Sequence, residues 1–475
     1  MGNPKGFIEV ARKESGYRPV AERTDDYGEV EQTLNEQDRK LQASRCMDCG
    51  IPFCHWACPV GSKIPEWQDA IYKGDWKLAS DILHSTNSFP EFTGRICPNP
   101  CEKSCVLAIH KESVTIRENE ASVVEKAFAE GYILPRIPKV RTGKKVAVIG
   151  SGPAGLSTAD VLNQMGHTVT VFEKDEAIGG LLRFGIPDFK LNKKIIDRRL
   201  ELFQQEGIKF KTNQYVGFDV KGSKLLNDFD AVVLAIGAMQ PRDLPVEGRE
   251  LKGVHFAMDF LTQQNRVNRG AKVAVKDRID AKGKNVLVIG GGDTGSDCVG
   301  TSNRQKARSV TQIEILPKPP EERAAGNPWP YWPTTLKTST SHEEGCERKW
   351  SLSTKKFIGS NGSLKKVELV EVEWTKDEKG SWKMNEVAGS EQIIDVDLVF
   401  LSMGFVHAIH RGVVEELAIE TDQRGNLKIN NNYQTSVDKV FAAGDSHNGA
   451  SLVVTAIQKG KEAAENVNNY LSGLV

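Results

Sequence analysis

The chain has 475 residues, a formal net charge of zero and 39% apolar residues, a length that predicts about three domains. The balanced charge argues against nucleic acids and membrane surfaces as partners, because both normally require a basic excess or stripe. No apolar run is long enough to span a bilayer and the first residues do not resemble an export signal, so we expect a cytoplasmic protein without disulfides.

Residues 1 to about 140 lack the alternation of strands and contain helix-like stretches such as residues 65–72. This region holds seven of the nine cysteines, namely Cys46, Cys49, Cys54, Cys58, Cys97, Cys101 and Cys105. Gaps of two to four residues bring thiolates to one inorganic core, and Cys58 is followed by proline as in ferredoxin-like runs. We therefore predict a helical iron–sulfur domain over residues 1–142.

The seven thiolates are one short of the eight that two 4Fe-4S clusters need. The acidic stretch at residues 117–120 offers a carboxylate as the missing ligand. One cluster with spare thiols is a simpler alternative. Zinc is another, because Cys-x2-Cys pairs commonly hold that ion and His55 could complete a site, although we expect His55 to be a packing residue.

A basic, proline-marked link over residues 135–143 ends this domain. Residues 145–149 then form a short apolar run typical of a buried parallel strand. The run leads into a helix through Gly150, Ser151, Gly152, Pro153, Ala154 and Gly155. In such a fingerprint the first glycine permits the turn, the second admits a pyrophosphate and the third allows close packing. Glu173 closes the next strand, where a carboxylate can bind ribose hydroxyls.

A second copy of this pattern follows in the chain. Residues 285–289 form the apolar run, and the turn after it consists of Gly290, Gly291, Gly292, Asp293, Thr294 and Gly295. One such turn alone is weak evidence, so the repetition is what makes the prediction specific. Two dinucleotide folds in one chain predict two bound dinucleotides.

A third element near the C-terminus is typical of the strand and helix that close over a flavin. The strand at residues 439–445 ends in Gly444 and Asp445. We expect Asp445 to hydrogen-bond the ribityl or pyrophosphate region. The helix expected to begin near Gly449 would direct its positive end at the flavin ring.

The sequence after the strand at residues 310–316 bears on the identity of the hydride donor. Lys318 and Arg323 are the candidates to hold a 2′-phosphate, and Arg304 and Arg308 lie behind them in the sequence. Glu314 would instead favour an unphosphorylated ribose if it pointed inward. The residues alone leave both NADPH and NADH open.

The stretch between the second fingerprint and the C-terminal element has two further features. Residues 327–333 are rich in tryptophan and proline; Trp329 and Trp332 either dock a partner or, as we expect, pack locally. Residues 366–374 alternate as in an antiparallel insertion. Cys298 and Cys346 are isolated, so this domain lacks the Cys-x2-Cys of thioredoxin-reductase-type enzymes.

These motifs together resemble the small (beta) subunit of glutamate synthase over essentially the whole chain. The matching stretches are residues 45–54, 93–98, 179–187, 290–295, 442–445 and 451–454. The resemblance implies an α/β fold, with an N-terminal helical iron–sulfur domain and two Rossmann-like dinucleotide-binding domains, the second inserted in the first. It implies that residues 143–253 and 406–475 bind FAD, and that residues 254–405 bind NADPH, with NADH possible.

For function, the resemblance implies an electron-input subunit that oxidises NADPH at FAD and needs no catalytic side-chain acid or base. Electrons would pass through two 4Fe-4S clusters to the glutamate synthase large (alpha) subunit, which makes L-glutamate from L-glutamine and 2-oxoglutarate. The implied FAD-binding residues are Gly150, Gly152, Pro153, Ala154, Gly155, Glu173, Gly180, Leu181, Gly237, Gly444, Asp445, Ser451, Leu452 and Val453. Those implied at the second nucleotide are Gly290, Gly292, Asp293, Thr294, Gly295, Lys318 and Arg323.

The cysteine-rich domain also resembles the electron-input half of dihydropyrimidine dehydrogenase, in which one cluster has a glutamine ligand. By this analogy one cluster is held by Cys46, Cys49, Cys54 and Cys105, and the other by Cys58, Cys97, Cys101 and Glu120. Glu118, two residues earlier, is the alternative to Glu120. Two other functions stay open: an NAD(P)H:acceptor oxidoreductase or input subunit for another partner such as a pyrimidine reductase, and a cluster or zinc scaffold with inactive dinucleotide folds.

Overall fold

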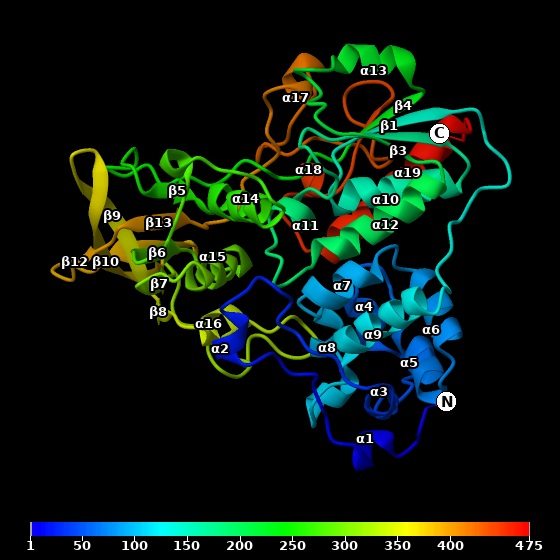
Figure 1. The fold of residues 1–475 in the computed structure, drawn as a ribbon, viewed down its shortest axis with the longest axis horizontal. Helices are drawn as coiled ribbons and strands as arrows, with labels where there is room; N and C mark the ends of the chain where they lie inside the picture. Colours follow the sequence, from blue (N-terminus) through cyan, green and yellow to red (C-terminus); the bar gives the residue numbers. More distant parts are fainter. Residues whose placement is uncertain (1, 475) are drawn as a thin grey trace.

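The computed structural model describes residues 2–474, which form three regions that meet near the centre of the molecule (Figure 1). The first region is built from helices, as the sequence predicts. Its elements are α1 (Gly6–Glu9), α2 (Val20–Arg23), α3 (Glu36–Ala43), α4 (Phe53–Ala57), α5 (Ile64–Lys73), α6 (Trp76–His84), α7 (Pro90–Ile96), α8 (Pro100–Lys103), the 3-10 helix η1 (Val106–Ile109) and α9 (Ile116–Ala129).

Local signals set the central helices of this region. Helix α5 has Pro65 in its first turn and ends at Gly74, whose φ of 81° suits a residue without a side chain. Asp75 caps α6 by accepting a hydrogen bond from the Leu78 N–H at 3.0 Å. Trp67 is fully buried in the same apolar cluster as two of the cysteines. The cysteine-bearing loops are therefore attached to a packed core.

The first dinucleotide fold is a parallel five-stranded sheet in the order β14-β4-β1-β2-β3. Its strands are β1 (Lys145–Ile149), β2 (Thr168–Phe172), β3 (Lys209–Lys211), β4 (Ala231–Leu234) and β14 (Val440–Ala442). The helices around it are α10 (Pro153–Gln164), α11 (Leu181–Phe184), α12 (Lys193–Gln205), α13 (Gly222–Asp228), α17 (Val413–Glu416), α18 (Asp445–Asn448) and α19 (Val453–Leu471). Strands β1 and β4 are buried along most of their length because helices cover the sheet.

The second dinucleotide fold is another parallel sheet, in the order β5-β13-β6-β7-β8. Its strands are β5 (Val254–Phe256), β6 (Asn285–Ile289), β7 (Ser309–Ile313), β8 (Glu347–Lys349) and β13 (Leu398–Leu401), with α14 (Ala257–Asn268), η2 (Val275–Asp277), α15 (Asp293–Arg304) and α16 (Thr340–Glu343). Strand β14 returns to pair with β4 of the first sheet. The second fold is thus inserted in the first, which confirms the predicted fold class.

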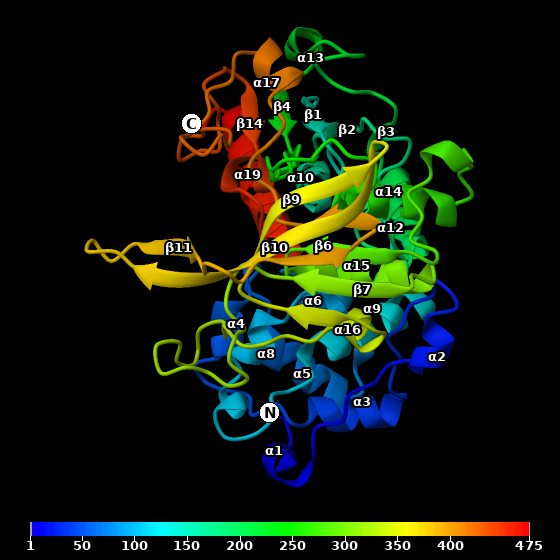
Figure 2. The same cartoon turned by 90° about the vertical axis from the view of Figure 1, so that its left-hand side faces the viewer.

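The predicted antiparallel insertion is also confirmed. It consists of β9 (Leu352–Ser360), β10 (Ser363–Lys376), β11 (Trp382–Glu386) and β12 (Gln392–Asp395). Strands β9, β11 and β12 each pair with β10 in antiparallel orientation. The end of β10 and β11 project from the molecule as a hairpin (Figure 2). In the described residues 2–474 no helix is long and apolar enough to cross a membrane.

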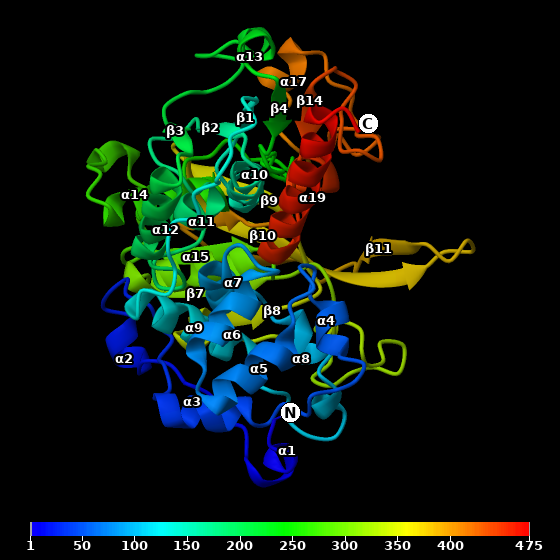
Figure 3. The same cartoon turned by 90° about the vertical axis from the view of Figure 1, so that its right-hand side faces the viewer.

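Buried charges connect the three regions. The first fold contacts the helical region where α19 meets α7 (Figure 3) and where Arg199 donates to Glu91 at 2.5 Å, both side chains being almost fully buried. The N-terminal segment carries α2 across to α16 of the second fold (Figure 1). There Arg23 and Arg304 both bind the buried carboxylate of Glu344, at 2.8 and 2.5 Å. These contacts hold both nucleotide folds against the cysteine-rich helices.

Candidate functional site

The first glycine turn leaves open space only where a phosphate would approach. Gly150 has a φ of 100°, and a Cβ there would strike the Ala235 carbonyl. A Cβ on Gly155 would strike the carbonyl oxygen of Gly150. A Cβ on Gly152, at the start of α10, would meet no atom within 4 Å. The first and third glycines therefore serve packing, whereas the second faces a free cradle that suits a pyrophosphate.

Glu173, at the end of β2, braces this turn. Its carboxylate accepts hydrogen bonds from the Ser151 N–H at 3.1 Å, the Ser151 hydroxyl at 2.5 Å and the Asp175 N–H at 2.9 Å. The side chain is 4% exposed, and burial raises the pKa of Glu173. A buried carboxylate beside the turn can also accept from ribose hydroxyls.

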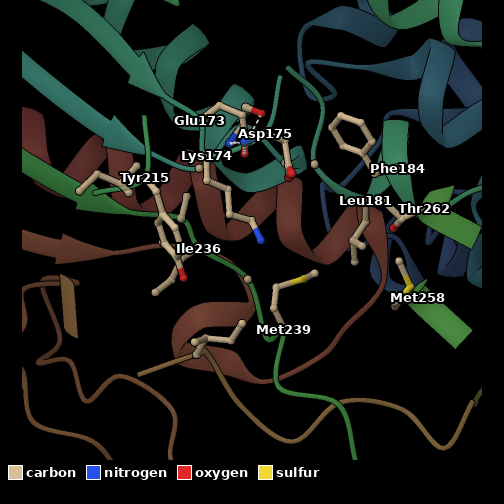
Figure 4. A pocket seen from close by; sticks show the side chains of 18 of the residues that line it. Glu173, Lys174, Asp175, Leu181, Phe184, Tyr215, Ile236, Met239, Met258 and Thr262 are labelled. Carbon is tan, nitrogen blue, oxygen red and sulfur yellow. Dashed lines mark hydrogen bonds between the residues drawn. The ribbon is translucent and has the colours of Figure 1, made fainter. Parts of the chain in front are cut away.

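A cavity of about 700 Å³ extends from this turn. Nine of the predicted residues line it: Gly150, Gly152, Pro153, Ala154, Glu173, Gly180, Leu181, Gly237 and Asp445. Figure 4 shows Lys174 and Met239 pointing into the space between Tyr215 on one side and Leu181 on the other. The sequence prediction missed Lys174, Tyr215 and Met239, because they follow strands without belonging to a motif.

Gly155 and Gly444 do not line this cavity but pack behind it. A Cβ on Gly444 would strike the side chain of Ala154. Asp445 accepts from the Ser451 hydroxyl at 2.6 Å, and burial raises the pKa of Asp445. The long helix begins at Val453 and not near Gly449, as the sequence analysis expects, because Gly449 has a φ of 78° and ends the short α18.

A second space, of about 750 Å³, joins all three regions of the molecule. It is lined by Ser451, Leu452 and Val453 at the start of α19, by Asp293 and Asp297 on α15, and by Cys97 and Asn99 of the helical region. Lys190 also lines this space and forms an ion pair with Asp297 at 2.5 Å. Burial lowers the pKa of Lys190, but the carboxylate of Asp297 outweighs this effect and raises it. The space is where the two nucleotide folds and one group of cysteines come together.

The second glycine turn repeats the geometry of the first. Gly290 has a φ of 118°, and Gly295 packs on Gly290. A Cβ on Gly292 would meet no atom within 4 Å. Gly292 precedes α15, whose first residues are Asp293 and Thr294. This turn therefore offers a second cradle for a pyrophosphate.

The acid of the second fold faces a different environment. Glu314 accepts from the Gly291 N–H at 2.7 Å and lies in an open cavity of about 1270 Å³, with Lys318 among its lining residues. The structure does not bring Arg323 there: its guanidinium donates to the carbonyls of Tyr331, at 2.7 Å, and Lys103, at 3.2 Å. The sequence could not foresee this, because the loop that carries Arg323 folds back on the cysteine-rich helices.

The seven N-terminal cysteines form two groups in space. The members of a group are identified by the neighbouring charges that shift the pKa of each thiol. Burial first, then Cys105 and Cys49, raise the pKa of Cys46 to about 12. Burial and the charges of Cys105, Cys46 and Cys49 raise the pKa of Cys54. Cys46, Cys49, Cys54 and Cys105 are therefore neighbours, and a bound cation would be needed to keep them as thiolates.

Cys58, Cys97 and Cys101 form the second group. Together with Glu120 they line a small cavity of about 20 Å³, which Val454 of α19 also reaches. Burial and then Glu120 and Cys58 raise the pKa of Cys97 to about 12. The grouping is the one that the resemblance implies.

Glu120 and Glu118 point in different directions. Glu120 accepts from the Thr93 hydroxyl at 2.6 Å and the Asn87 amide at 2.9 Å, and burial raises the pKa of Glu120 to about 7. Glu118 instead accepts from the Ser15 hydroxyl at 2.6 Å and lies outside the small cavity. Of the two acids, Glu120 is the one in position to complete a set of four ligands.

Among residues 2–474, no three cysteine, histidine or carboxylate side chains converge as closely as a single bound metal ion would need. His55 accepts from the Ile64 N–H at 2.9 Å and so holds the start of α5. Trp329 packs on Phe53 of α4, with ring centres 4.6 Å apart, so the packing of this tryptophan is made with the helical region and not within its own loop.

Comparison with known proteins agrees with this geometry. Residues 144–460 match the family described as Pyridine nucleotide-disulphide oxidoreductase, and residues 23–132 match Dihydropyrimidine dehydrogenase domain II, 4Fe-4S cluster. The chain is 48% identical to the glutamate synthase [NADPH] small chain of Mycobacterium tuberculosis, over all of this chain and 97% of that protein. It is 44% identical to glutamate synthase [NADH] of Schizosaccharomyces pombe, over 99% of this chain and 23% of that protein.

Among solved structures, FprA of Mycobacterium tuberculosis in complex with NADPH has a TM-score of 0.56 at 17% identity, covering 70% of this chain and 86% of FprA. At that identity the likeness concerns the fold alone. The two sheets described above therefore have a fold similar to that of FprA.

Proposed function

The chain belongs to the family of glutamate synthase small chains, and from that premise we propose that it is the electron-input subunit of a glutamate synthase. In this role it is an NADPH-dependent oxidoreductase that oxidises NADPH at FAD. Electrons then pass through two 4Fe-4S clusters to a large subunit that makes L-glutamate from L-glutamine and 2-oxoglutarate. A cytoplasmic location is part of the proposal, since cluster assembly needs cysteines that are kept reduced.

One observation supports this function more than any other. The space of about 750 Å³ is lined at once by the start of α19, by α15 of the second nucleotide fold and by Cys97. A hydride donor, a flavin and a cluster ligand can therefore meet without a large rearrangement of the chain. When bound, FAD supplies the exchange between a two-electron hydride and the single electrons that iron–sulfur clusters accept.

The chain's own residues position and shield these groups. The cradles at Gly152 and Gly292 orient two pyrophosphates, and Asp445 is held by Ser451 so that its carboxylate faces the first cavity. The first turn of α19 presents unpaired backbone N–H groups to the shared space, which favours negative charge there. No side-chain acid or base is required for hydride transfer, because the rings need only be held in contact.

The two cysteine groups lie at different depths along this route. The group of Cys58, Cys97 and Cys101 shares its cavity with Val454 of α19, beside the nucleotide folds. Exposed apolar side chains lie in the segments that carry the group of Cys46, Cys49, Cys54 and Cys105: Ile51 is 78% exposed and Trp56 is 62% exposed, and Trp56 contacts Tyr331, which is 58% exposed. We propose that electrons leave at this exit surface and that the large subunit docks there, because exposed apolar clusters mark contact sites.

The substitution Cys46→Ser tests the proposed route. Flavin binding and NADPH oxidation with a soluble dye should be nearly unchanged, while electron delivery to the large subunit falls by about a hundredfold as the cluster is lost. Cys346→Ser, which removes an isolated cysteine of the second nucleotide fold, is the matched control. Equal loss of both activities in Cys46→Ser would mean that the helical region is only structural.

A further inference from the structure

The two nucleotide folds place an acid at the same point of the same construction. Glu173 accepts from the N–H of Ser151, the residue after the first glycine of its turn, at 3.1 Å. Glu314 accepts from the N–H of Gly291, the equivalent residue of the second turn, at 2.7 Å. Glu314 also accepts from the Leu316 N–H at 3.2 Å, so both of its oxygens are oriented by the backbone. The ribose of the second nucleotide is thus expected beside Glu314.

Positive side chains line the cavity that holds Glu314. Lys318, Lys337 and Arg348 line the same cavity as Glu314. The guanidinium of Arg348 lies 5.0 Å from the ring centre of Trp350, and the ammonium of Lys318 lies 5.7 Å from the same ring. One indole therefore holds two cations at the edge of the cavity.

The strand register directs Arg348 toward the glycine turn. Arg348 pairs with Gln312 across the parallel strands β8 and β7, and paired residues of neighbouring strands point to the same face. The amide of Gln312 donates to the Gly290 carbonyl at 2.8 Å, so this face is the one that carries the turn. Arg348 consequently lies on the side of the sheet where the ribose is expected.

These cations are poorly neutralised within the protein. In the described part of the chain, residues 2–474, neither Arg348 nor Lys337 has a carboxylate within ion-pair distance. Lys318 approaches Glu321 only at 4.0 Å, and Arg348 donates to the Thr338 hydroxyl at 3.4 Å. Uncompensated cations around an open cavity favour an anionic ligand.

We propose that this site selects its hydride donor at the ribose 2′ position through two opposed groups: Arg348 with Lys318 bind a 2′-phosphate, and Glu314 accepts from a free 2′-hydroxyl. The inference rests on the proposed function, since it assumes that the second fold binds a nicotinamide dinucleotide. A phosphate monoester carries nearly two negative charges at neutral pH and binds a guanidinium through paired hydrogen bonds. Glu314 repels that phosphate, so the preference for NADPH over NADH is a balance that either group can shift.

The test is anaerobic bleaching of the flavin in the cofactor-loaded, full-length protein, titrated with NADPH and with NADH. Arg348→Gln should weaken NADPH binding roughly tenfold to a hundredfold, because a hydrogen bond to a charged group is lost, and should leave NADH within about twofold. Glu314→Gln should have the opposite effect: it should strengthen the binding of NADPH and weaken the binding of NADH. Its amide oxygen still accepts from the Gly291 N–H.

Two controls make the result decisive. Lys366→Gln removes a positive charge from the antiparallel sheet of the same domain, outside the cavity, and should leave both affinities unchanged. Lys318→Gln provides an independent variant if Arg348→Gln does not fold. Lys318→Gln should weaken the binding of NADPH by a smaller factor than Arg348→Gln does.

Equal weakening of NADPH and NADH by both Arg348→Gln and Lys318→Gln would overturn the inference, and so would equal binding of 2′,5′-ADP and 5′-AMP by calorimetry. Failure of the proposed function is a separate result, in which neither nucleotide bleaches the flavin of the unaltered protein. Calorimetry with 2′,5′-ADP still tests the inference in that case.

Discussion

The two dinucleotide folds share a construction but treat their acid differently. In the first, Glu173 is 4% exposed and packed under its own turn. In the second, Glu314 is only partly buried and lies in an open cavity of about 1270 Å³. The first fold is thus built to enclose one nucleotide tightly, and the second to admit and release one. That difference suits a resident flavin beside an exchanging hydride donor.

The largest effect should come from filling the first cradle. Gly152→Ala adds a methyl group that meets no protein atom within 4 Å, so the chain should fold, but the methyl occupies the place of the pyrophosphate. Crowding of this kind costs about 1–3 kcal/mol, or roughly 5-fold to 150-fold in FAD affinity. The purified protein should be depleted of flavin and should lose NADPH oxidation, as measured by absorbance and dye reduction. Full flavin content would show that the first turn does not hold the pyrophosphate.

The matched change in the second fold should have a narrower effect. Gly292→Ala also meets no protein atom, so its flavin content should stay normal while the concentration of NADPH needed to bleach it rises by roughly the same 5-fold to 150-fold. Stopped-flow reduction by NADPH measures this directly. If Gly292→Ala lost flavin as well, the two folds would not be independent sites.

The smallest effect concerns acid stability of the second fold. Burial lowers the pKa of His342 to about 4, and its neutral ring donates to Gln312 at 2.8 Å and accepts from the Ser339 N–H at 3.1 Å. Between about pH 6.5 and pH 4 the unfolded chain binds a proton that the folded chain does not, so stability falls as pH falls through this range. Because the ring is partly exposed, the loss is about 1 kcal/mol.

The variant His342→Gln should remove that part of the pH dependence. Between pH 7.5 and pH 5 the thermal unfolding temperature should fall by about 2 °C less in the variant than in the unaltered protein. His84→Gln is a useful comparison, since burial also lowers the pKa of His84 to about 4, but in the helical region. Identical pH profiles for His342→Gln and the unaltered chain would contradict the assignment.

The sequence predicts most of this architecture because its signals are local. Strand, glycine turn, helix and acid lie within one short segment, so Gly152, Glu173 and Gly292 could be placed in advance. The inserted order of the folds follows from the resemblance. Glu120 was preferred to Glu118 through the resemblance alone, since both lie on α9 and only the packing of the helix determines which one faces the cysteines.

Long-range placement is what the sequence could not supply. Arg323 looked suited to a 2′-phosphate, but its loop folds back onto the carbonyl of Lys103. Arg348 follows the strand end by more than thirty residues and reaches the cavity only because β8 pairs with β7. Nothing in the spacing of residues 314–348 indicates that return.

The proposed function requires that a nucleotide at the second fold transfers a hydride to a flavin at the first, and that single electrons then pass to iron–sulfur clusters. Its most direct test is an anaerobic titration of the purified chain with NADPH, followed by optical and low-temperature EPR spectra together with iron, sulfide and zinc analysis. We predict that NADPH bleaches the flavin and reduces clusters containing roughly eight irons per chain. A flavin that stays oxidised, or zinc in place of iron, would contradict it.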